Sequence, residues 1–316
     1  MRLMPSNSYT AMAPCSTANL GPGYDVFGLA LDALDDKVKV TRLSSDRERI
    51  TIKTNDKTIP VRPELNSAGL VVKKMMRDFE IYDSVDIEIT KGVPAGYGIG
   101  SSAATSAAAA VAFNALYGLQ ICKNRLVQYA AEGEVASAGA RHYDNVSASL
   151  LGGFVVSRIS DHMPPQFTRL EPPRDLVLVV TVPWLEVPPK KTEMARSVLP
   201  MEVPLKSVVR NISGAATIVA GFALKNVETI ASGIDDVIIE SARKHLIPGY
   251  DDIKQKAIFA GALAVTISGA GPSMIAFLKT SKNAKKVGAA MSQGFKAVGV
   301  KSKVLVCRPS RGACIL

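Results

Sequence analysis

A glycine-rich stretch, Gly92-Val-Pro-Ala-Gly-Tyr-Gly-Ile-Gly-Ser-Ser-Ala-Ala104, is the part of the sequence best suited to chemistry. Gly96, Gly98 and Gly100 recur at every second position and lead into an alanine-rich run. Glycine adopts positive φ angles and lets the main chain approach a ligand closely, and the free N–H groups at a helix start attract an anion. The stretch therefore predicts a phosphate-binding loop followed by a helix. The simpler alternative is a flexible loop in which Ser101 caps the helix.

Two familiar phosphate-binding loops do not fit these residues. A Walker A loop ends in Gly-Lys-Ser/Thr, whereas Gly100 is followed by Ser101 and Ser102. A dinucleotide fingerprint needs the spacing G-x-G-x-x-G, which Gly96-x-Gly98-x-Gly100 does not have. The predicted cradle therefore contains no lysine of its own.

Two further turn-rich stretches lie near the two ends of the chain. In residues 19–28, Gly21-Pro-Gly23 predicts a tight turn that presents Asn19 and Asp25, although both could simply cap a turn or a helix. Near the other end, Ser268-Gly-Ala-Gly-Pro272 is predicted to join two strands. The chain thus contains three glycine loops.

A polar cluster, Arg141-His-Tyr-Asp-Asn145, lies between a predicted helix at residues 124–139 and a predicted strand at residues 150–156. Functional side chains are often presented between regular elements. A purely structural role is the alternative for the lone histidine. Glu134, on the preceding helix, is a candidate metal ligand, and the alternative for it is a solvated helix face.

The remaining pattern alternates between strands and helices. Strands are predicted at residues 37–43, 49–54, 85–90, 176–182 and 303–307, and on both sides of the Ser268–Pro272 loop within residues 264–277. Helices are predicted at residues 66–79, 101–116, 208–224, 234–246 and 282–297, with a further helix carrying Glu193 and Arg196. This alternation indicates a mixed α/β (α+β) architecture. The proline-rich residues 161–174 are the best place for a boundary, which divides the chain into domains 1–165 and 166–316.

Composition and charge limit the class of protein. The 316 residues are 47% hydrophobic and 21% charged, so the chain is expected to be globular, with no apolar run near the length of a membrane span. Residues 1–13 are too polar for a signal peptide, which favours the cytoplasm. The formal charge of +10 is spread along the chain without a nucleic-acid-binding motif, and it favours small anionic ligands over nucleic acid.

The four cysteines do not have the spacing of metal ligands. Cys307 and Cys314 are close enough in sequence to pair with each other or across a dimer. Because disulfides are uncommon in the cytoplasm, free thiols are expected.

The three glycine stretches together resemble the three motifs of the GHMP kinase superfamily. Pro94-x-x-x-Gly98-x-Gly100-Ser-Ser-Ala103 is the most specific of them, and residues 13–28 resemble the N-terminal signature of the homoserine kinases within that superfamily. The resemblance implies a two-domain fold, with an N-terminal domain like ribosomal protein S5 domain 2 and a C-terminal ferredoxin-like domain. It also implies transfer of the γ-phosphoryl group of ATP to L-homoserine in threonine biosynthesis, with Mg²⁺, by a homodimer.

The same resemblance assigns roles to individual residues. Nucleotide binding is assigned to Asn66, Lys91, Pro94, Ala95, Gly96, Tyr97, Gly98, Ile99, Gly100, Ser101 and Ser102, and Mg²⁺ binding to Ser102 and Glu134. Substrate binding is assigned to Asn19, Asp25, His142, Asp144, Arg196 and Arg243, with the two arginines on the substrate carboxylate.

The mechanism is left as a hypothesis of direct transfer, in which the catalytic residues are Asn19, Asp144, Asn145 and Thr192. Asn19 and Asn145 would orient the hydroxyl group and Thr192 would contact the γ-phosphoryl group. Some relatives in the superfamily use an aspartate base with a lysine partner, but no lysine stands near Asn19 or Asp25 in the sequence. Asp144 as a general base remains the alternative.

Two alternative functions stay open. Another small-molecule kinase, of the mevalonate or shikimate type, would share the phosphate loop, but mevalonate has no ammonium group to pair with Asp25 and Asp144. A catalytically silent ATP-binding regulator would not need Glu134, Arg196 and Arg243, all of which are present.

Overall fold

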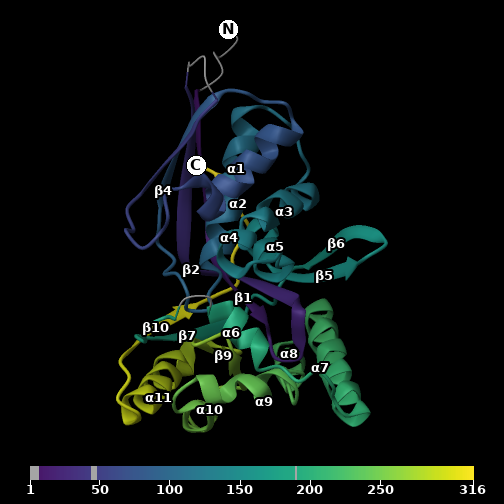
Figure 1. Cartoon of the computed structure of the whole chain (residues 1–316). Coiled ribbons are helices and arrows are strands. Elements are labelled where there is room, and N and C mark those ends of the chain that lie inside the picture. Colours follow the sequence, from purple (N-terminus) through teal and green to yellow (C-terminus); the bar gives the residue numbers. More distant parts are fainter. Residues whose placement is uncertain (1–6, 44–47, 189–190) are drawn as a thin grey trace.

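The computed structural model describes residues 7–43, 48–188 and 191–316. Its elements form two sheets with helices packed against them, and the two parts lie one above the other in Figure 1. The strands of the larger sheet are β1 (Ser8–Asn19), β2 (Gly23–Leu43), β3 (Ile50–Thr54), β4 (Ser84–Thr90), β5 (Phe154–Ser160), β6 (Met163–Leu170) and β11 (Cys314–Ile315). The helices of this half are α1 (Ser67–Asp78), α2 (Ser101–Leu116), α3 (Lys123–Glu132), α4 (Glu134–Ala138) and α5 (Tyr143–Leu151).

The second half carries the smaller sheet. Its strands are β7 (Val177–Pro183), β8 (Ala264–Ile267), β9 (Met274–Leu278) and β10 (Ser302–Cys307). Its helices are α6 (Lys191–Ser197), α7 (Leu205–Leu224), α8 (Val227–Ser232), α9 (Ile239–Arg243), α10 (Tyr250–Phe259) and α11 (Ala284–Ala297). Single 3-10 turns occur at Pro63–Leu65, Lys244–Leu246 and Ser281–Asn283.

Strand β2 organises the larger sheet, whose order is β11-β1-β2-β4-β3. The C-terminal part of β2 pairs with β4, and its N-terminal part, Phe27 to Leu29, pairs with β5. Strand β3 runs parallel to β4, and the other pairs in this sheet are antiparallel. One long strand therefore connects the phosphate-loop region to the β5–β6 hairpin.

Helix α2 occupies the centre of the first half. Seven of its alanines have no exposed surface: Ala103, Ala104, Ala107, Ala108, Ala109, Ala110 and Ala112. Small side chains let the helix backbone approach its neighbours closely on almost every side, and β1, β2, α1, α3 and α5 all pack against it. The helix that follows the glycine loop is thus fixed from all sides.

The smaller sheet has the order β10-β7-β9-β8, and all of its pairs are antiparallel. With helices between β7 and β8 and between β9 and β10, this is a βαββαβ arrangement in the order 4-1-3-2. The ferredoxin-like prediction for the second half is confirmed.

Several predicted elements have different bounds. Asp144 and Asn145 lie in the first turn of α5 and not between elements, because the helix begins directly after His142 and continues to Leu151. The predicted helix at residues 124–139 is interrupted at Gly133, and the predicted helix at residues 234–246 is reduced to α9 and a 3-10 turn.

The proline-rich residues 161–174 do not form a simple linker. Most of them belong to β6, an edge strand that pairs with β5 alone among the described strands and therefore accommodates Pro164 and Pro165. The domain division between residues 165 and 166 lies inside this strand, and it stays a proposal. Cys307 is buried, Cys314 is exposed, and neither forms a disulfide within the described part of the chain.

Helix α7 stands at the outer edge of the second half (Figure 1). Within the described ranges it is the one helix with the length and composition of a membrane span, at 20 residues, so the expectation that no apolar run reaches this length is wrong. Its exposed side chains include Leu205, Val209 and Ile212. Of the 18-residue apolar stretch within this helix, only 17% is buried.

The two halves meet where the third glycine loop packs against the first and second. Asn19 donates its amide hydrogen to the carbonyl oxygen of Gly269 at 2.8 Å, and Ser268 donates its hydroxyl hydrogen to the carbonyl oxygen of Gly98 at 2.8 Å. A Cβ atom on Gly98 would stand 2.6 Å from the carbonyl oxygen of Gly271. Contact between the halves therefore requires glycine at position 98.

We predict that Gly98→Ala lowers the free energy of unfolding more than Gly118→Ala does. Both glycines have positive φ, +75° and +58°, but nothing lies within 4 Å of a Cβ at Gly118. Backbone strain alone should cost about 1 kcal/mol at Gly118, and overpacking should add about 1–3 kcal/mol at Gly98. Denaturant titration of the two variants measures the difference. Equal losses in the free energy of unfolding would contradict the prediction, because the contact between the halves would then adjust to the added methyl group at little cost.

Candidate active site

A cavity of about 340 Å³ opens at the junction of the two halves. It is lined by most of the residues that the sequence analysis singled out: Asn19, Asp25, Asn66, Lys91, Ala95, Gly96, Gly98, Gly100, Ser101, Ser102, Glu134, His142, Asp144, Asn145, Thr192, Arg196 and Arg243. The fold thus brings together side chains from all three glycine stretches and from α4, α5, α6 and α9.

The phosphate loop has the backbone that its sequence predicts. The φ angles are +86° at Gly96, +75° at Gly98 and +69° at Gly100. Gly100 is the residue directly before α2. Glycine is needed here because other residues rarely adopt these angles. The free N–H groups in the first turn of α2 border the cavity and can bind an anion.

Three of the predicted nucleotide-binding residues do not line this cavity with their side chains. Ile99 is buried in the core, and Tyr97 donates its hydroxyl hydrogen to the carbonyl oxygen of Leu185 at 3.1 Å. Pro94 and Tyr97 border a separate groove beside Trp184. A contact of these residues with nucleotide would have to come from the main chain, and Pro94 has no N–H group to give.

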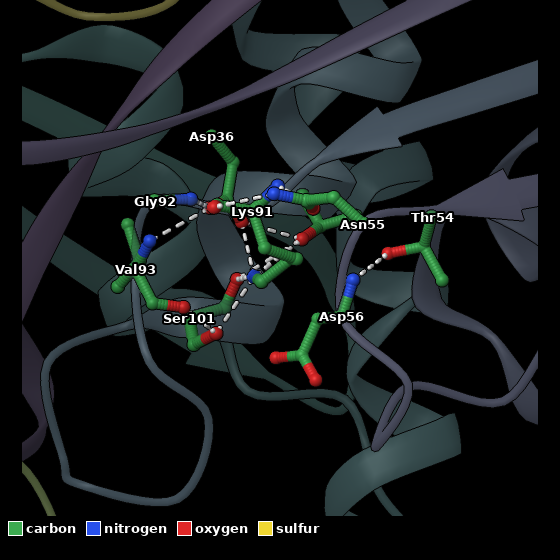
Figure 2. A network of polar contacts seen from close by, with 9 residues as sticks. Asp36, Thr54, Asn55, Asp56, Lys91, Gly92, Val93 and Ser101 are labelled. Atoms are coloured by element: carbon green, nitrogen blue, oxygen red, sulfur yellow. Dashed lines mark hydrogen bonds and ion pairs between the residues drawn. The ribbon is translucent and has the colours of Figure 1, made fainter.

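Lys91 is bound to Asp36 and lies next to Ser101, at the start of α2 (Figure 2). Asp36 has no exposed surface, and its carboxylate also accepts hydrogen bonds from the N–H groups of Gly92 and Val93, both at 3.0 Å. The Lys91 ammonium further donates to the Ser101 hydroxyl at 2.7 Å. Burial lowers the pKa of Lys91, although the Asp36 charge opposes this.

The sequence analysis predicts that Lys91 binds the nucleotide, and this stays a prediction. The ammonium group is committed to Asp36, Ser101 and Thr105, and it fixes the strand before the loop to the helix after it. Asp36 was missed in the sequence because nothing local distinguishes it from its exposed neighbours on the same strand.

Asn66 has a structural task as well. Its side-chain oxygen accepts a hydrogen bond from the N–H of Gly69 and caps α1, and its amide donates to the carbonyl oxygen of Pro60 at 2.7 Å. Together with Ile59, Pro60 and Leu65 it lines one part of the cavity, which is largely apolar. Such a wall suits a planar ring system more than a phosphate group.

At the opposite end of the cavity, Arg196 forms an ion pair with Asp25. Nη2 of Arg196 lies 2.7 Å and 2.8 Å from the two carboxylate oxygens and 2.9 Å from Nδ1 of His142. Burial, followed by the charge of Arg196, lowers the pKa of His142, so the neutral ring accepts through Nδ1 and carries its proton on Nε2. Among the described residues, neither Nε2 of His142 nor Nε of Arg196 has a hydrogen-bond partner.

Tyr24 holds the two predicted carboxylate-binding arginines and was not identified from the sequence. The guanidinium carbons of Arg196 and Arg243 lie 5.3 Å and 5.0 Å from the centre of its ring. Nε of Arg243 also donates to the carbonyl oxygen of Ala195 at 2.8 Å. Two guanidinium groups held on one aromatic ring have the charge and the planar donors to pair with a carboxylate.

Two asparagines between these ends are held in place by hydrogen bonds. Asn19 accepts a hydrogen bond from the N–H of Asp25 at 3.1 Å, and the Asn145 side-chain oxygen accepts one from the hydroxyl of Ser16 at 2.9 Å. Thr192, in the first turn of α6, also lines the cavity. The cavity lining therefore contains fixed amide groups and a hydroxyl group.

Glu134 and Asp144 are buried carboxyl groups at the side of the cavity. Burial raises the pKa of both to about 7, and a hydrogen bond from Ser102 lowers that of Glu134 in part. Burial of such groups is unfavourable unless a cation is present, and hydroxyl and carboxylate oxygens suit Mg²⁺. No group of three or more His, Cys, Asp or Glu residues that could hold a metal ion occurs in the described part of the chain. Ser102 and Glu134 fit a magnesium ion that is also held by phosphates and water.

Lys191 is a further residue to which the sequence analysis gave no role. It is the first residue of α6, it lines the cavity together with Asn19 and Asp25, and its ammonium donates to the carbonyl oxygen of Gly271. In the sequence no lysine stands near Asn19 or Asp25, but the docking of the two halves places Lys191 in the lining of the same cavity.

Comparison with known proteins defines the class. The family described as GHMP kinases N terminal domain matches residues 66–153, and the one described as GHMP kinases C terminal matches residues 218–297. These two regions contain the phosphate loop and most of the ferredoxin-like half.

Individual relatives narrow the class further. Homoserine kinase of Thermoplasma volcanium is 39% identical over 300 residues, which cover 94% of this chain and 93% of that protein. The crystal structure of homoserine kinase from Cytophaga hutchinsonii is 34% identical and superposes with a TM-score of 0.92 over 100% of this chain and 99% of that one. The chain therefore belongs to the GHMP kinases and, within them, to the homoserine kinase family, which confirms the predicted fold.

A more distant structure shares the fold alone. Mevalonate kinase of L. major, in complex with R-mevalonate, is 13% identical with a TM-score of 0.69 over 99% of this chain and 100% of that one. The substrate pocket must therefore be interpreted from its own side chains.

We predict that Lys91→Met destabilises the ligand-free protein by about 3–5 kcal/mol, because it leaves the Asp36 carboxylate buried without its cation. Adding Asp36→Asn should restore part of this loss, since the amide oxygen can still accept from Gly92 and Val93. A double-mutant cycle by denaturant titration measures the coupling. If the double variant is no more stable than Lys91→Met, the ion pair is not what holds the loop to the helix.

Proposed function

We propose that this protein phosphorylates L-homoserine on its side-chain hydroxyl group, with ATP as the donor, to give O-phospho-L-homoserine. The assignment to the homoserine kinase family and the two ends of the cavity support this proposal. Since the product lies on the route to threonine, we place the enzyme in threonine biosynthesis, in the cytoplasm.

The observation that carries the proposal is the charge pattern opposite the phosphate loop. Arg196 and Arg243 stack on Tyr24, and Asp25 lies next to Arg196. An amino acid presents an ammonium group and a carboxylate at one carbon, so Asp25 and Asp144 can accept its ammonium while the arginines bind its carboxylate. Mevalonate and shikimate have no ammonium group, and they would leave the acidic side of this pocket unpaired.

At the other end, we propose that the triphosphate of ATP binds to the loop from Gly96 to Ser102 and that its base lies against Ile59, Pro60 and Leu65. Ser102 and Glu134 would hold Mg²⁺, which neutralises charge on the phosphates. Between the two ends, the amides of Asn19 and Asn145 would orient the homoserine hydroxyl group.

We predict that Arg196→Ala lowers kcat/KM for L-homoserine by about 10²–10³, because a charge-assisted pair with the substrate carboxylate is lost. The KM for ATP should change little. Arg42→Ala is the matched control, since Arg42 pairs with Asp83 on the surface and its removal should change turnover by no more than about twofold.

Coupled ADP release with L-homoserine, mevalonate, shikimate, L-serine and L-threonine measures these values. Turnover of homoserine alone supports the proposal. Turnover of a different alcohol would contradict the substrate, and no turnover of any would favour an ATP-binding regulator.

For the chemical step we propose direct transfer, without a general base. Phosphoryl transfer depends mainly on alignment and charge neutralisation, and the asparagine amides are already fixed by hydrogen bonds. The competing base would be Asp144, whose pKa burial raises to about 7, a value suitable for accepting a proton.

The Asp144→Asn variant distinguishes the two mechanisms. Direct transfer predicts a kcat within about threefold of the wild-type value, whereas loss of a general base costs about 10²–10⁴ in rate. Asparagine can still accept the hydrogen bond from the N–H of Asn145, which Asp144 accepts at 2.7 Å, so the helix start is preserved. The KM for homoserine, measured in the same assay, separates a binding defect from a catalytic one.

We also propose that the enzyme is a homodimer and does not bind membranes or nucleic acid. The exposed apolar side chains of α7 support contact with a second copy of the chain, because a continuous apolar face of this kind is uncommon on a monomer. Lys206 and Arg210 on the same helix do not fit the hydrocarbon region of a bilayer.

A further inference from the structure

Lys191 is the one lysine besides Lys91 that lines the cavity in the described part of the chain. Lys91 is already paired with Asp36, whereas Lys191 forms no ion pair with any described residue. Its ammonium donates to the carbonyl oxygen of Gly271 in the third glycine loop.

That contact places the Lys191 ammonium beside the phosphate loop. The carbonyl oxygen of Gly271, to which it donates, stands 2.6 Å from the position of a Cβ on Gly98. Thr192, the next residue, borders the same cavity. A positive group from the second half of the chain is thus inserted next to the middle glycine of the cradle.

We propose that Lys191 is the phosphate-binding lysine that the glycine-rich loop itself lacks, and that it contacts the γ-phosphoryl group of ATP during transfer. The proposal rests on the assignment of this cavity to ATP and homoserine.

The electrostatic environment favours a polyanion at this place. Burial lowers the pKa of Lys191 to about 7, and the positive charge of Arg243 adds to the effect. A triphosphate next to the ammonium group raises the pKa of Lys191 again, because an opposite charge at short range favours the protonated form. Binding of ATP would therefore charge Lys191 at the moment when its charge is needed.

The positive charge of Lys191 can stabilise the phosphoryl group during its transfer. As the bond from the γ-phosphorus to the bridging oxygen breaks, the bond to the homoserine hydroxyl oxygen forms, and the hydroxyl proton passes to a phosphoryl oxygen. Negative charge moves over the phosphoryl oxygens during this exchange, and an ammonium group beside them stabilises it. Lys191 forms no covalent intermediate and returns unchanged.

A structural role is the competing explanation, because Lys191 also ties α6 to the third glycine loop. Lys191→Gln separates the two roles, since its amide can still donate to Gly271 while the charge is lost. Lys191→Arg keeps both the charge and the donor. Lys285→Gln is the control, because Lys285 is an exposed residue of α11 far from the cavity lining.

The experiment measures kcat by ADP release and compares the Kd values of ADP and of the non-hydrolysable analogue AMP-PNP by calorimetry. For Lys191→Gln we expect kcat to fall by about 10²–10³. AMP-PNP should bind about tenfold more weakly, while the Kd of ADP stays within about twofold, because only the analogue has a γ-phosphoryl group. Lys191→Arg should recover most of the affinity for AMP-PNP, and Lys285→Gln should resemble the wild type.

The proposal is overturned if Lys191→Gln keeps wild-type kcat, or if ADP and AMP-PNP lose affinity equally. The ratio of the two Kd values does not depend on the fraction of folded protein, so it stays decisive for an unstable variant. Absence of wild-type turnover with homoserine would reject the proposed substrate instead, and the ratio of Kd values would still test Lys191.

Discussion

The buried carboxylate of Asp36 is the constraint on which the rest of the site depends. It accepts hydrogen bonds from the main chain just before the phosphate loop, and it binds the Lys91 ammonium, which in turn contacts the first residue of α2. A charge without exposed surface is tolerated only when all of its acceptor positions are used. The loop between Val93 and Ser101 is therefore anchored at both ends by one residue of a strand.

With its ends fixed, the loop can serve as a surface on which the second half of the chain docks. Ser268 forms a hydrogen bond with the second glycine stretch, and Gly269 forms hydrogen bonds with the first. The third glycine loop is therefore held in place by both of them. The cavity exists because these contacts hold the two sheets at a fixed separation. Its residues come from distant parts of the sequence because the site is built at that junction.

The ligand-free pocket already contains an ion pair that resembles its proposed ligand. Arg196 and Asp25 satisfy each other, and a zwitterionic amino acid would supply a carboxylate to the one and an ammonium to the other. Exchange of one ion pair for two keeps every charge neutralised, which favours a zwitterion over a plain acid or alcohol. The aromatic ring of Tyr24 keeps both guanidinium groups in place during such an exchange.

The sequence by itself determined the family, the α/β class, the phosphate loop and most of the residues around the cavity. These features depend on local chemistry: glycine at positive φ, alanine in a closely packed helix, and Ser102 at a helix start. Element bounds were less certain, as at Gly133 and in β6, because packing and not propensity decides them.

Only the tertiary structure decided which side chains meet. Asp36 and Lys91 are 55 residues apart, and Arg196 is 171 residues from Asp25. Tyr24 and Lys191 carry no motif, and their importance arises from what the fold places beside them. No local pattern encodes such contacts, because they form only when segments far apart in the sequence come together in the tertiary fold.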